Sequence, residues 1–356
     1  MQVSRPIFPL PRALAENMES GRPEYELALR KVRWGDGPMY ITGHGDSFFA
    51  ALTGARDFES LLGLPVLAQT ALDFCNYSAA AIQPHSVFLA ISQSGETVET
   101  LDAMRAARSR GAQVLAMTGN SSSAMATAAD QVFLTRTGNL EGSGEGADLI
   151  HHTAIGYLAL LASRLLKRHH RQLDALEIEF QRLPATVETI AIQLGDAIRA
   201  LARELQRAGE VAILGAGCYW PVALQSASLL HRIRFRQAVS VNAAQGVQIG
   251  CGGDGRSMLF LSGTGCRLKK TVHAMAADAQ GRGSPVLAMT DGNDRELLKA
   301  SSLAIILPGA TEMTGALLAL AGMEFLSAAL RRDNAAYQKG RAVAPPMAGV
   351  APAHQK

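Results

Sequence analysis

The stretch 86–97, SVFLAISQSGET, joins a run of apolar residues to a cluster of hydroxyl and amide side chains. The apolar residues 87–91 have the length of a buried β-strand, and the pattern over 96–110 predicts an amphipathic helix. Ser92, Gln93, Ser94 and Gly95 therefore lie where a strand turns into a helix. Backbone N–H groups at a helix start are unpaired, and the helix dipole favours an anion there. The stretch thus predicts a strand of an α/β sheet that ends in an anion site.

The sequence repeats this pattern a second time. The segment VLAMTGN (114–120) recurs as VLAMTDGN (286–293). Working back from both, YITGHGDSFFAAL (40–52) matches AILGAGCYWPVAL (212–224), and SVFLAISQSG (86–95) matches SMLFLSGTGC (257–266). Similar segments in the same order at a fixed spacing indicate a duplicated domain.

Each copy alternates apolar strands with amphipathic helices. This alternation predicts an α/β fold in which helices cover both faces of a parallel sheet, a three-layer arrangement of the flavodoxin or Rossmann kind. In the first copy we expect strands at 38–42, 65–69, 86–91, 113–117 and 131–135, and helices at 46–62, 72–80, 96–110 and 121–128. The whole chain then divides into an N-terminal segment (1–36), a first domain (37–170), a helical connector interrupted by Pro184 (171–208), a second domain (209–332) and a tail (333–356).

Composition narrows the class of protein. The formal net charge is +3, and the basic residues are scattered, so no nucleic-acid surface is expected. Cys75, Cys218, Cys251 and Cys266 show no metal-ligand spacing, so no metal site is predicted. The N-terminus lacks the apolar core of a signal peptide, and the apolar segment 149–166 carries two histidines and an arginine. These features predict a cytoplasmic protein without a membrane span, with 149–166 as a buried helix.

A second polar turn supports a ligand site. The turn GDS (45–47) follows the first strand, so Gly45 and Ser47 would lie at the same edge of the sheet as residues 92–97. The hydroxyls of Ser92, Ser94 and Thr97 could then surround a phosphate monoester. The alternative is that Ser94 merely caps the helix. A dinucleotide site is disfavoured because GHGDSF lacks the third glycine, and a P-loop because no GK[ST] follows.

These motifs resemble the sugar isomerase (SIS) domain, and the doubled arrangement resembles the isomerase half of glucosamine-6-phosphate synthase and related phosphosugar isomerases and deaminases. The resemblance covers about residues 6–340. It implies that the sugar phosphate is bound by Ser47, Ser92, Gln93, Ser94 and Thr97, with Gly45 and Gly95 allowing close approach. It also implies a homodimer that needs no cofactor and lacks a glutaminase half.

The catalytic positions depart from the family pattern. The resemblance places Arg232 where the family has a glutamate base, and Gln245 and Gln248 in the stretch that holds a histidine. Arginine stays protonated in proteins and cannot act as a base. Glu141 and Glu145 are candidate replacements.

Other residues near these positions leave alternatives open. Asp148 stands, by the resemblance, where the family usually has a lysine, and the stretch 138–148 could equally be a solvated acidic loop. His151 and His152 could reach the pocket or serve as core residues. Lys339 resembles a family lysine that reaches the active site, or is a surface lysine. His231 and Arg232 could bind a substrate carboxylate or a second phosphate, or lie on a helix surface.

The second-copy loop, SGTGCRLKK (262–270), keeps the hydroxyl pattern and adds three basic residues. We expect a duplicated scaffold whose charges face solvent, with a second anion site as the alternative. The resulting hypothesis is a phosphosugar-binding protein that isomerises or deaminates an amino-sugar or ketose phosphate at C1 and C2. The alternative is a catalytically silent phosphosugar sensor, because the expected glutamate and histidine are missing.

Overall fold

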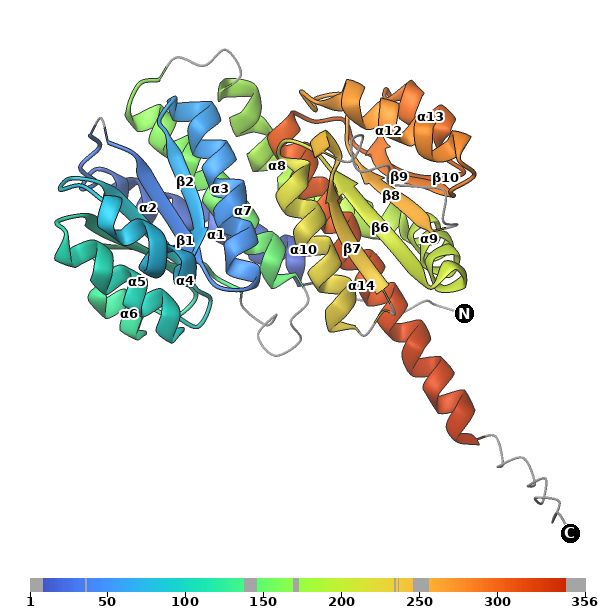
Figure 1. The fold of residues 1–356 in the computed structure, drawn as a ribbon, viewed down its shortest axis with the longest axis horizontal. Coiled ribbons are helices and arrows are strands. Elements are labelled where there is room, and N and C mark those ends of the chain that lie inside the picture. Colours follow the sequence, from blue (N-terminus) through green and yellow to red (C-terminus); the bar gives the residue numbers. More distant parts are fainter. Residues whose placement is uncertain are drawn as a thin grey trace, which may run out of the picture.

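Two parallel five-stranded sheets form the cores of two domains (Figure 1). The structure is a computed structural model that describes residues 9–35, 37–137, 146–168, 173–233, 235, 237–245 and 256–343, with side chains up to residue 332. The strand order is β2-β1-β3-β4-β5 in the first sheet and, read from its other edge, β7-β6-β8-β9-β10 in the second. Counted from the first strand of each domain, the two orders are the same. The predicted doubled α/β fold is therefore confirmed.

The strands follow the apolar runs of the sequence closely. The first sheet contains β1 (Met39–Gly43), β2 (Val66–Thr70), β3 (Val87–Ile91), β4 (Gln113–Thr118) and β5 (Gln131–Leu134). The second contains β6 (Glu210–Gly215), β7 (Gln237–Asn242), β8 (Ser257–Leu261), β9 (Val286–Asp291) and β10 (Leu303–Leu307). Every residue of β1, β3 and β4 is buried, as expected for strands covered by helices on both faces.

Helices fill the intervals between the strands. In the first domain they are α1 (Leu10–Glu19), α2 (Gly21–Leu29), α3 (Asp46–Leu62), α4 (Ala71–Asp73), α5 (Val98–Ser109), α6 (Ala124–Ala128) and α7 (Ala147–Leu165). They are followed by α8 (Leu173–Gln193), α9 (Gly195–Ala208), α10 (Tyr219–Arg232), α12 (Lys269–Gly281), α13 (Arg295–Ala300) and α14 (Glu312–Val343). The predicted helix over 46–62 matches α3 at both ends.

Two local predictions were wrong. The single helix expected over 72–80 is instead α4, a π-helical turn (Phe74–Ser78) and a 3₁₀ turn (Ala79–Ala81). This winding buries Phe74, whose ring lies 4.7 Å from that of Phe88. Pro184 does not interrupt the connector, because α8 runs through it and ends at Gln193. The buried neighbours Leu183 and Val187 hold the helix together where the proline removes one hydrogen bond.

The two domains meet where α3 packs against α10 and where α7 packs against α14. Helix α7 packs against α3 and α14, and α14 packs against α10 and α9 (Figure 1). The apolar segment 149–166 lies almost entirely in α7 and is buried, as predicted. A buried leucine or isoleucine such as Leu158 or Ile155 contributes roughly 1.5–3 kcal/mol. The helix thus stabilises the domain junction on which the site depends.

Within the described residues, the segment Glu312–Arg332 of α14 is long and apolar enough to cross a membrane, with a mean hydropathy of 1.6. In the protein, however, 89% of this window is buried. Burial of this extent is typical of a core helix, and the contacts of α14 with both domains agree with that role.

Asp57 is a buried carboxyl group at the domain junction. It lies on α3, is 1% exposed, and neither of its oxygens has a hydrogen-bond partner in the described part of the chain. Burial, together with the nearby Glu312 carboxylate, raises the pKa of Asp57 well above its usual value. An acid with a raised pKa lowers the stability of the fold as the pH rises from its unfolded pKa through its folded one.

We therefore expect Asp57→Leu to raise the free energy of unfolding at pH 8 by about 1–3 kcal/mol, because an unpartnered buried polar group costs about that much. Urea denaturation at several pH values between 4 and 8 would measure the effect. The gain over the wild type should widen as the pH rises. A variant that is less stable than the wild type at pH 8 would show that the carboxyl group has a partner in solution.

Candidate functional site

The carboxyl edge of the first sheet carries the two predicted polar turns. Strands β1 and β3 are neighbours, and Gly43 is aligned with Ile91. The turn before α3 and the turn before α5 therefore leave the sheet side by side. We call Ser47 and residues 92–97 the hydroxyl cradle. Gly45, at the start of α3, has a φ of 56° that favours glycine.

The hydroxyls of the cradle form a compact group. Ser92 is 4% exposed, and its Oγ lies 2.9 Å from Thr97 Oγ1 and 3.5 Å from Ser94 Oγ. The same Oγ accepts a 3.2 Å hydrogen bond from the Gly95 N–H. The three hydroxyls predicted to act together are thus brought together by the fold.

Helix α5 begins without a side-chain cap. The N-cap residue is Thr97, which makes no side-chain cap hydrogen bond, and Ser94 Oγ accepts instead from the Glu96 N–H at 3.2 Å. The alternative that Ser94 caps α5 is therefore wrong. The N–H groups of Val98 and Glu99 have no acceptor among the described residues. A helix start with free donors beside three hydroxyls is suited to an anion.

Gln93 is oriented into the protein. Its Nε2 donates to Thr137 Oγ1 at 3.0 Å, and its Oε1 lies 3.4 Å from Thr135 Oγ1. Its backbone carbonyl accepts from the Gly119 N–H at 3.0 Å. The sequence suggested that the Gln93 amide would face the ligand, but here the amide links the cradle to the end of β5. The threonines that hold it were not singled out from the sequence.

Arg232 reaches the first domain from the end of α10. Its guanidinium forms ion pairs with Asp148 at the start of α7 and with Asp46 at the start of α3, the latter at 3.3 Å. Asp46 Oδ1 also accepts a 2.6 Å hydrogen bond from Ser228. We call Asp46, Asp148 and Arg232 the interdomain ion triad. Because the Arg232 side chain pairs with two carboxylates, the triad does not support its predicted role in binding a second phosphate or a substrate carboxylate.

Burial and nearby charges shift the pKa of Asp148. Burial raises the pKa of Asp148 to about 6, and the nearby Asp46 adds to the rise, while the Arg232 guanidinium opposes it. Asp46, which directly precedes Ser47, was not singled out from the sequence. His231 is exposed, and no described residue forms a hydrogen bond or ion pair with its side chain.

Two histidines of α7 are buried, His151 beside Thr135 and His152 between α3 and α10. His151 Nε2 lies 3.5 Å from Thr135 Oγ1, and His152 Nδ1 lies 2.8 Å from Thr53 Oγ1. His152 Nε2 also faces Gln225 of α10 at 3.4 Å. Burial lowers the pKa of His151 to about 4 and that of His152 to about 3. Both rings are therefore neutral at pH 7, which agrees with the core alternative for His152.

Several predicted residues lie outside the described part of the chain. These are Glu141 and Glu145 in the stretch 138–145, and Gln248 in the stretch 246–255. Lys339 belongs to the backbone of α14, but its side chain is not described. The end of α14 extends away from both sheets (Figure 1). The roles of these four residues stay predictions.

In the second-domain loop, the Thr264 donors are bonded within the chain. Asp291 Oδ2 accepts from the Thr264 N–H at 2.5 Å and from the Thr264 hydroxyl at 2.9 Å. Lys269 Nζ donates to the Thr264 carbonyl at 2.9 Å, and Arg267 contacts Ser60 and Glu312. The expectation that these charges face solvent holds for Arg267, whose side chain is 67% exposed, and for Lys270, and it was wrong for Lys269, which is half-buried. The scaffold reading is favoured, because a carboxylate of the chain already uses the Thr264 donors.

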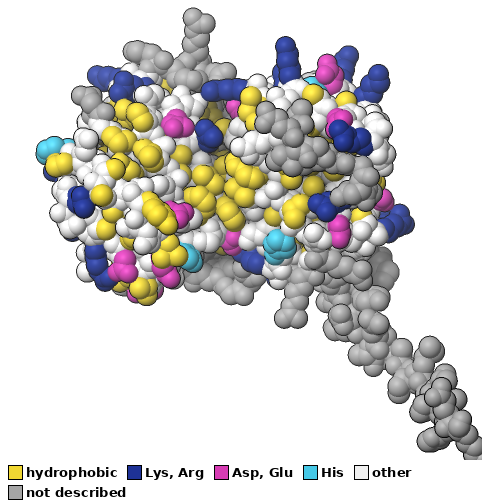
Figure 2. Space-filling view, in the orientation of Figure 1, with side chains coloured by type: hydrophobic (Ala, Val, Ile, Leu, Met, Phe, Trp, Pro, Cys, Tyr) yellow, Lys and Arg dark blue, Asp and Glu magenta, His cyan; other side chains and the backbone are white. Residues whose placement is uncertain are grey.

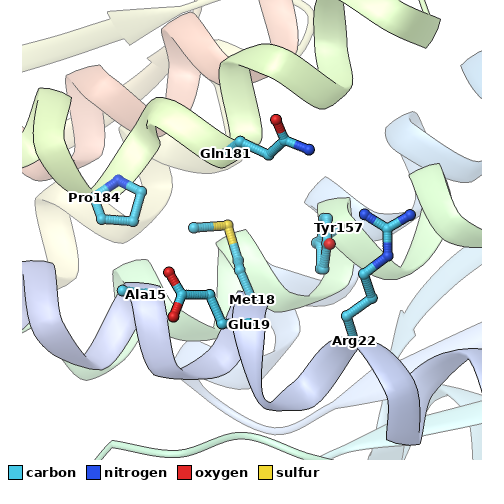
Figure 3. Close-up of a pocket in the computed structure, with 7 residues that line it drawn as sticks. All are labelled: Ala15, Met18, Glu19, Arg22, Tyr157, Gln181 and Pro184. Atoms are coloured by element: carbon cyan, nitrogen blue, oxygen red, sulfur yellow. The ribbon is translucent and has the colours of Figure 1, made fainter.

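A cavity of about 200 Å³ lies away from the sheet edge, between α1, α2, α7 and α8 (Figure 3). Its lining includes Met18, Tyr157 and Arg22. The Arg22 guanidinium is already paired with Glu26 and Glu177, at 2.8 and 2.9 Å. The cavity therefore offers no free cation to an anion, and it does not compete with the hydroxyl cradle as a phosphate site.

Residues 36–161 match the family model of the SIS domain. This match identifies the first domain as a SIS domain, and the second sheet repeats its strand order. The glutamine–fructose-6-phosphate aminotransferase of Synechocystis sp. is 27% identical over 302 residues, which cover 81% of this chain and 47% of that protein. The corresponding enzyme of Methanothermobacter thermautotrophicus is 34% identical over 191 residues, 54% of this chain and 30% of that protein.

Solved structures share the fold. The C-terminal domain of glucosamine-fructose-6-phosphate aminotransferase from Francisella tularensis superposes with a TM-score of 0.80 at 17% identity, covering 91% of this chain and 94% of that one. The tagatose-6-phosphate ketose/aldose isomerase of Escherichia coli gives a TM-score of 0.71 at 17% identity, covering 92% and 91%. The chain spans about half the length of the aminotransferases that it matches over most of its own length.

Proposed function

We propose that the protein binds a sugar phosphate at the hydroxyl cradle and isomerises or deaminates it at C1 and C2. The observation that carries the proposal is the group formed by Ser92, Ser94 and Thr97 beside the free N–H groups of α5. The SIS-domain match and the aminotransferase relatives support a phosphosugar as the ligand. We further propose that the protein acts in the cytoplasm without a metal or cofactor, and binds neither nucleic acid nor membranes.

Calorimetry with glucosamine 6-phosphate and fructose 6-phosphate tests the binding site. A hydrogen bond to a charged group contributes about 1.5–3 kcal/mol, so Ser94→Ala should weaken binding roughly ten- to a hundredfold. Thr264→Ala is the matched control, because its hydroxyl is bonded to Asp291 in the other domain. A silent Ser94→Ala together with a Thr264→Ala that abolishes binding would place the ligand in the second domain.

A second candidate function is a catalytically silent phosphosugar sensor. The observation that favours it is Arg232, which occupies the expected position of the base and is paired with Asp46 and Asp148. Interconversion of fructose 6-phosphate and glucose 6-phosphate, and release of ammonia from glucosamine 6-phosphate, would be assayed with purified protein. Tight binding with no turnover of any of these compounds would favour the sensor.

We also propose that two copies of the chain form a homodimer beside the cradle. Leu72, Tyr77 and Val98 are 50%, 81% and 64% exposed, and they lie on elements that pack together near the start of α5. Hydrophobic side chains are visible at the surface of both domains (Figure 2). Light scattering should give about twice the 37.7 kDa of one chain, and Tyr77→Ser with Val98→Ser should shift the mass to one chain. A monomeric wild type at micromolar concentration would contradict the proposal.

A further inference from the structure

Two series of contacts link the interdomain ion triad to the hydroxyl cradle. On one side, Arg232 joins Asp148 to Asp46, and Asp46 is the chain neighbour of Ser47. On the other side, His151 stands three residues after Asp148 on the first turn of α7 and approaches Thr135, which contacts Gln93. Both routes place the start of α7 next to the residues that would hold the phosphate.

Among the described acids and bases at this edge, Asp148 is the best suited to move a proton. Asp46 has both oxygens engaged, by Ser228 and Arg232. Glu96 is exposed and accepts from the Ala124 N–H at 2.9 Å. For Asp148, by contrast, no described residue donates to Oδ1, while Oδ2 is held by Arg232. Among the described residues, its carboxyl group is therefore held at one oxygen only.

The charges around Asp148 are suited to a base that works near neutral pH. Its neighbours are the Arg232 guanidinium of α10, the Asp46 carboxylate of α3 and the neutral His151 ring of α7, and Glu324 of α14 acts on Arg232. A base is most effective when its pKa lies near the working pH, and that of Asp148 is raised by burial to about 6. His151, with its pKa lowered to about 4, is a weaker base.

We propose that Asp148 carries the proton between C1 and C2 of the bound sugar phosphate and that Arg232 positions its carboxylate from the second domain. The inference rests on the proposed function. In a ring-opened ketose phosphate, Asp148 would take a proton from C1. The C–H electron pair forms the C1–C2 double bond, and the C2 carbonyl electrons move onto O2. The O1 proton then passes to O2, C1 becomes the carbonyl, and Asp148 returns its proton to C2. Substrate and product are isomers, so no oxidant or reductant is needed.

The test compares Asp148→Asn with Asp174→Asn. Asp174 also pairs with an arginine, Arg164, but it is 87% exposed and lies on α8. We expect Asp148→Asn to lower kcat for the fructose 6-phosphate and glucose 6-phosphate interconversion by about 10²–10⁴-fold. The Kd for the sugar phosphate should change by less than about threefold, because general acid–base catalysis acts on the reacting carbons rather than on the phosphate. Asp174→Asn should leave both values unchanged, and Asp148→Glu should recover part of the activity.

The pH dependence of kcat distinguishes a catalytic role of Asp148 from a structural one. In the wild type, kcat should rise with pH through the Asp148 pKa of about 6, which gives the pH profile an acidic limb. The Asp148→Asn variant should lack this limb. Arg232→Met should move the limb to higher pH, because the guanidinium favours the charged carboxylate.

Failure of the proposed function and failure of the Asp148 role give different results. A wild type that binds no sugar phosphate defeats the proposed function itself. A wild type that binds but turns nothing over, or an Asp148→Asn variant within threefold of wild-type kcat, overturns the role of Asp148 and leaves the binding site standing. If Asp148→Asn does not fold, the wild-type profile decides: a flat kcat between pH 5 and 7 overturns the inference.

Discussion

Gly95→Ala is expected to abolish sugar-phosphate binding, with a loss of more than about a hundredfold in affinity. Gly95 has a φ of 68°, and a side chain in this left-handed conformation costs about 1–2 kcal/mol. A Cβ atom at this position would lie 2.2 Å from Ser123 Oγ and 2.8 Å from Thr118 Oγ1. Ser123 is fully buried and caps α6, so it cannot move aside without cost. The loop must shift instead, and its N–H would leave Ser92.

Calorimetry with glucosamine 6-phosphate measures this loss, and a thermal melt shows whether the first domain stays folded. The loss corresponds to about 3 kcal/mol of binding free energy. Gly281→Ala is the matched control, because nothing lies within 4 Å of a Cβ atom at that position. Undiminished binding by a folded Gly95→Ala variant would mean that the cradle does not hold the ligand.

The second large effect is a loss of stability in acid caused by His151 and His152. Both rings are fully buried, and burial lowers their pKa values to about 4 and about 3. The unfolded chain protonates its histidines near pH 6.5, whereas the folded chain keeps these two neutral. The folded state is therefore at its full stability above pH 6.5 and loses stability as the pH falls through 6.5 towards the lowered pKa values. At pH 4 the two rings together should cost about 6 kcal/mol.

Urea denaturation between pH 7.5 and 4.5 would measure this dependence. His152→Gln should reduce it by about half, because glutamine can bond to Thr53 and Gln225 but does not take up a proton, while His151 keeps its share. His85→Asn is the control, since His85 is exposed and asparagine tolerates its φ of 73°. If His152→Gln shows the same steep acid loss as the wild type, the ring is protonated in the folded protein.

The sequence was sufficient for the fold because the relevant signals are local or repeated. Apolar runs such as 87–91 give the strands of the first sheet within one or two residues. The recurrence of VLAMT predicts two sheets with one strand order. The π-helical turn at Phe74–Ser78 was missed because it depends on how Phe74 packs against Phe88, and no local pattern carries that contact.

The site was predicted less completely, because several of its contacts join residues that are far apart in the sequence. Ser92, Ser94 and Thr97 are close in sequence, and their grouping follows from a single turn. The partners of Arg232 lie on two other helices, at positions 46 and 148. No local sequence pattern shows that these residues meet. The orientation of the Gln93 amide depends on threonines at the end of a different strand.

The contact between Asp291 and Thr264 has a consequence for how the two copies can evolve. In the second copy, a carboxylate of the same chain uses the Thr264 donors, so a change at this contact acts through folding. Changes there are neutral whenever a new pair of residues keeps that contact. In the first copy, the N–H groups of Val98 and Glu99 have no acceptor among the described residues, and the proposed sugar phosphate would add a constraint on that loop beyond folding. On this proposal the two loops diverge differently after duplication: one within the limits of stability, the other also within the limits of binding.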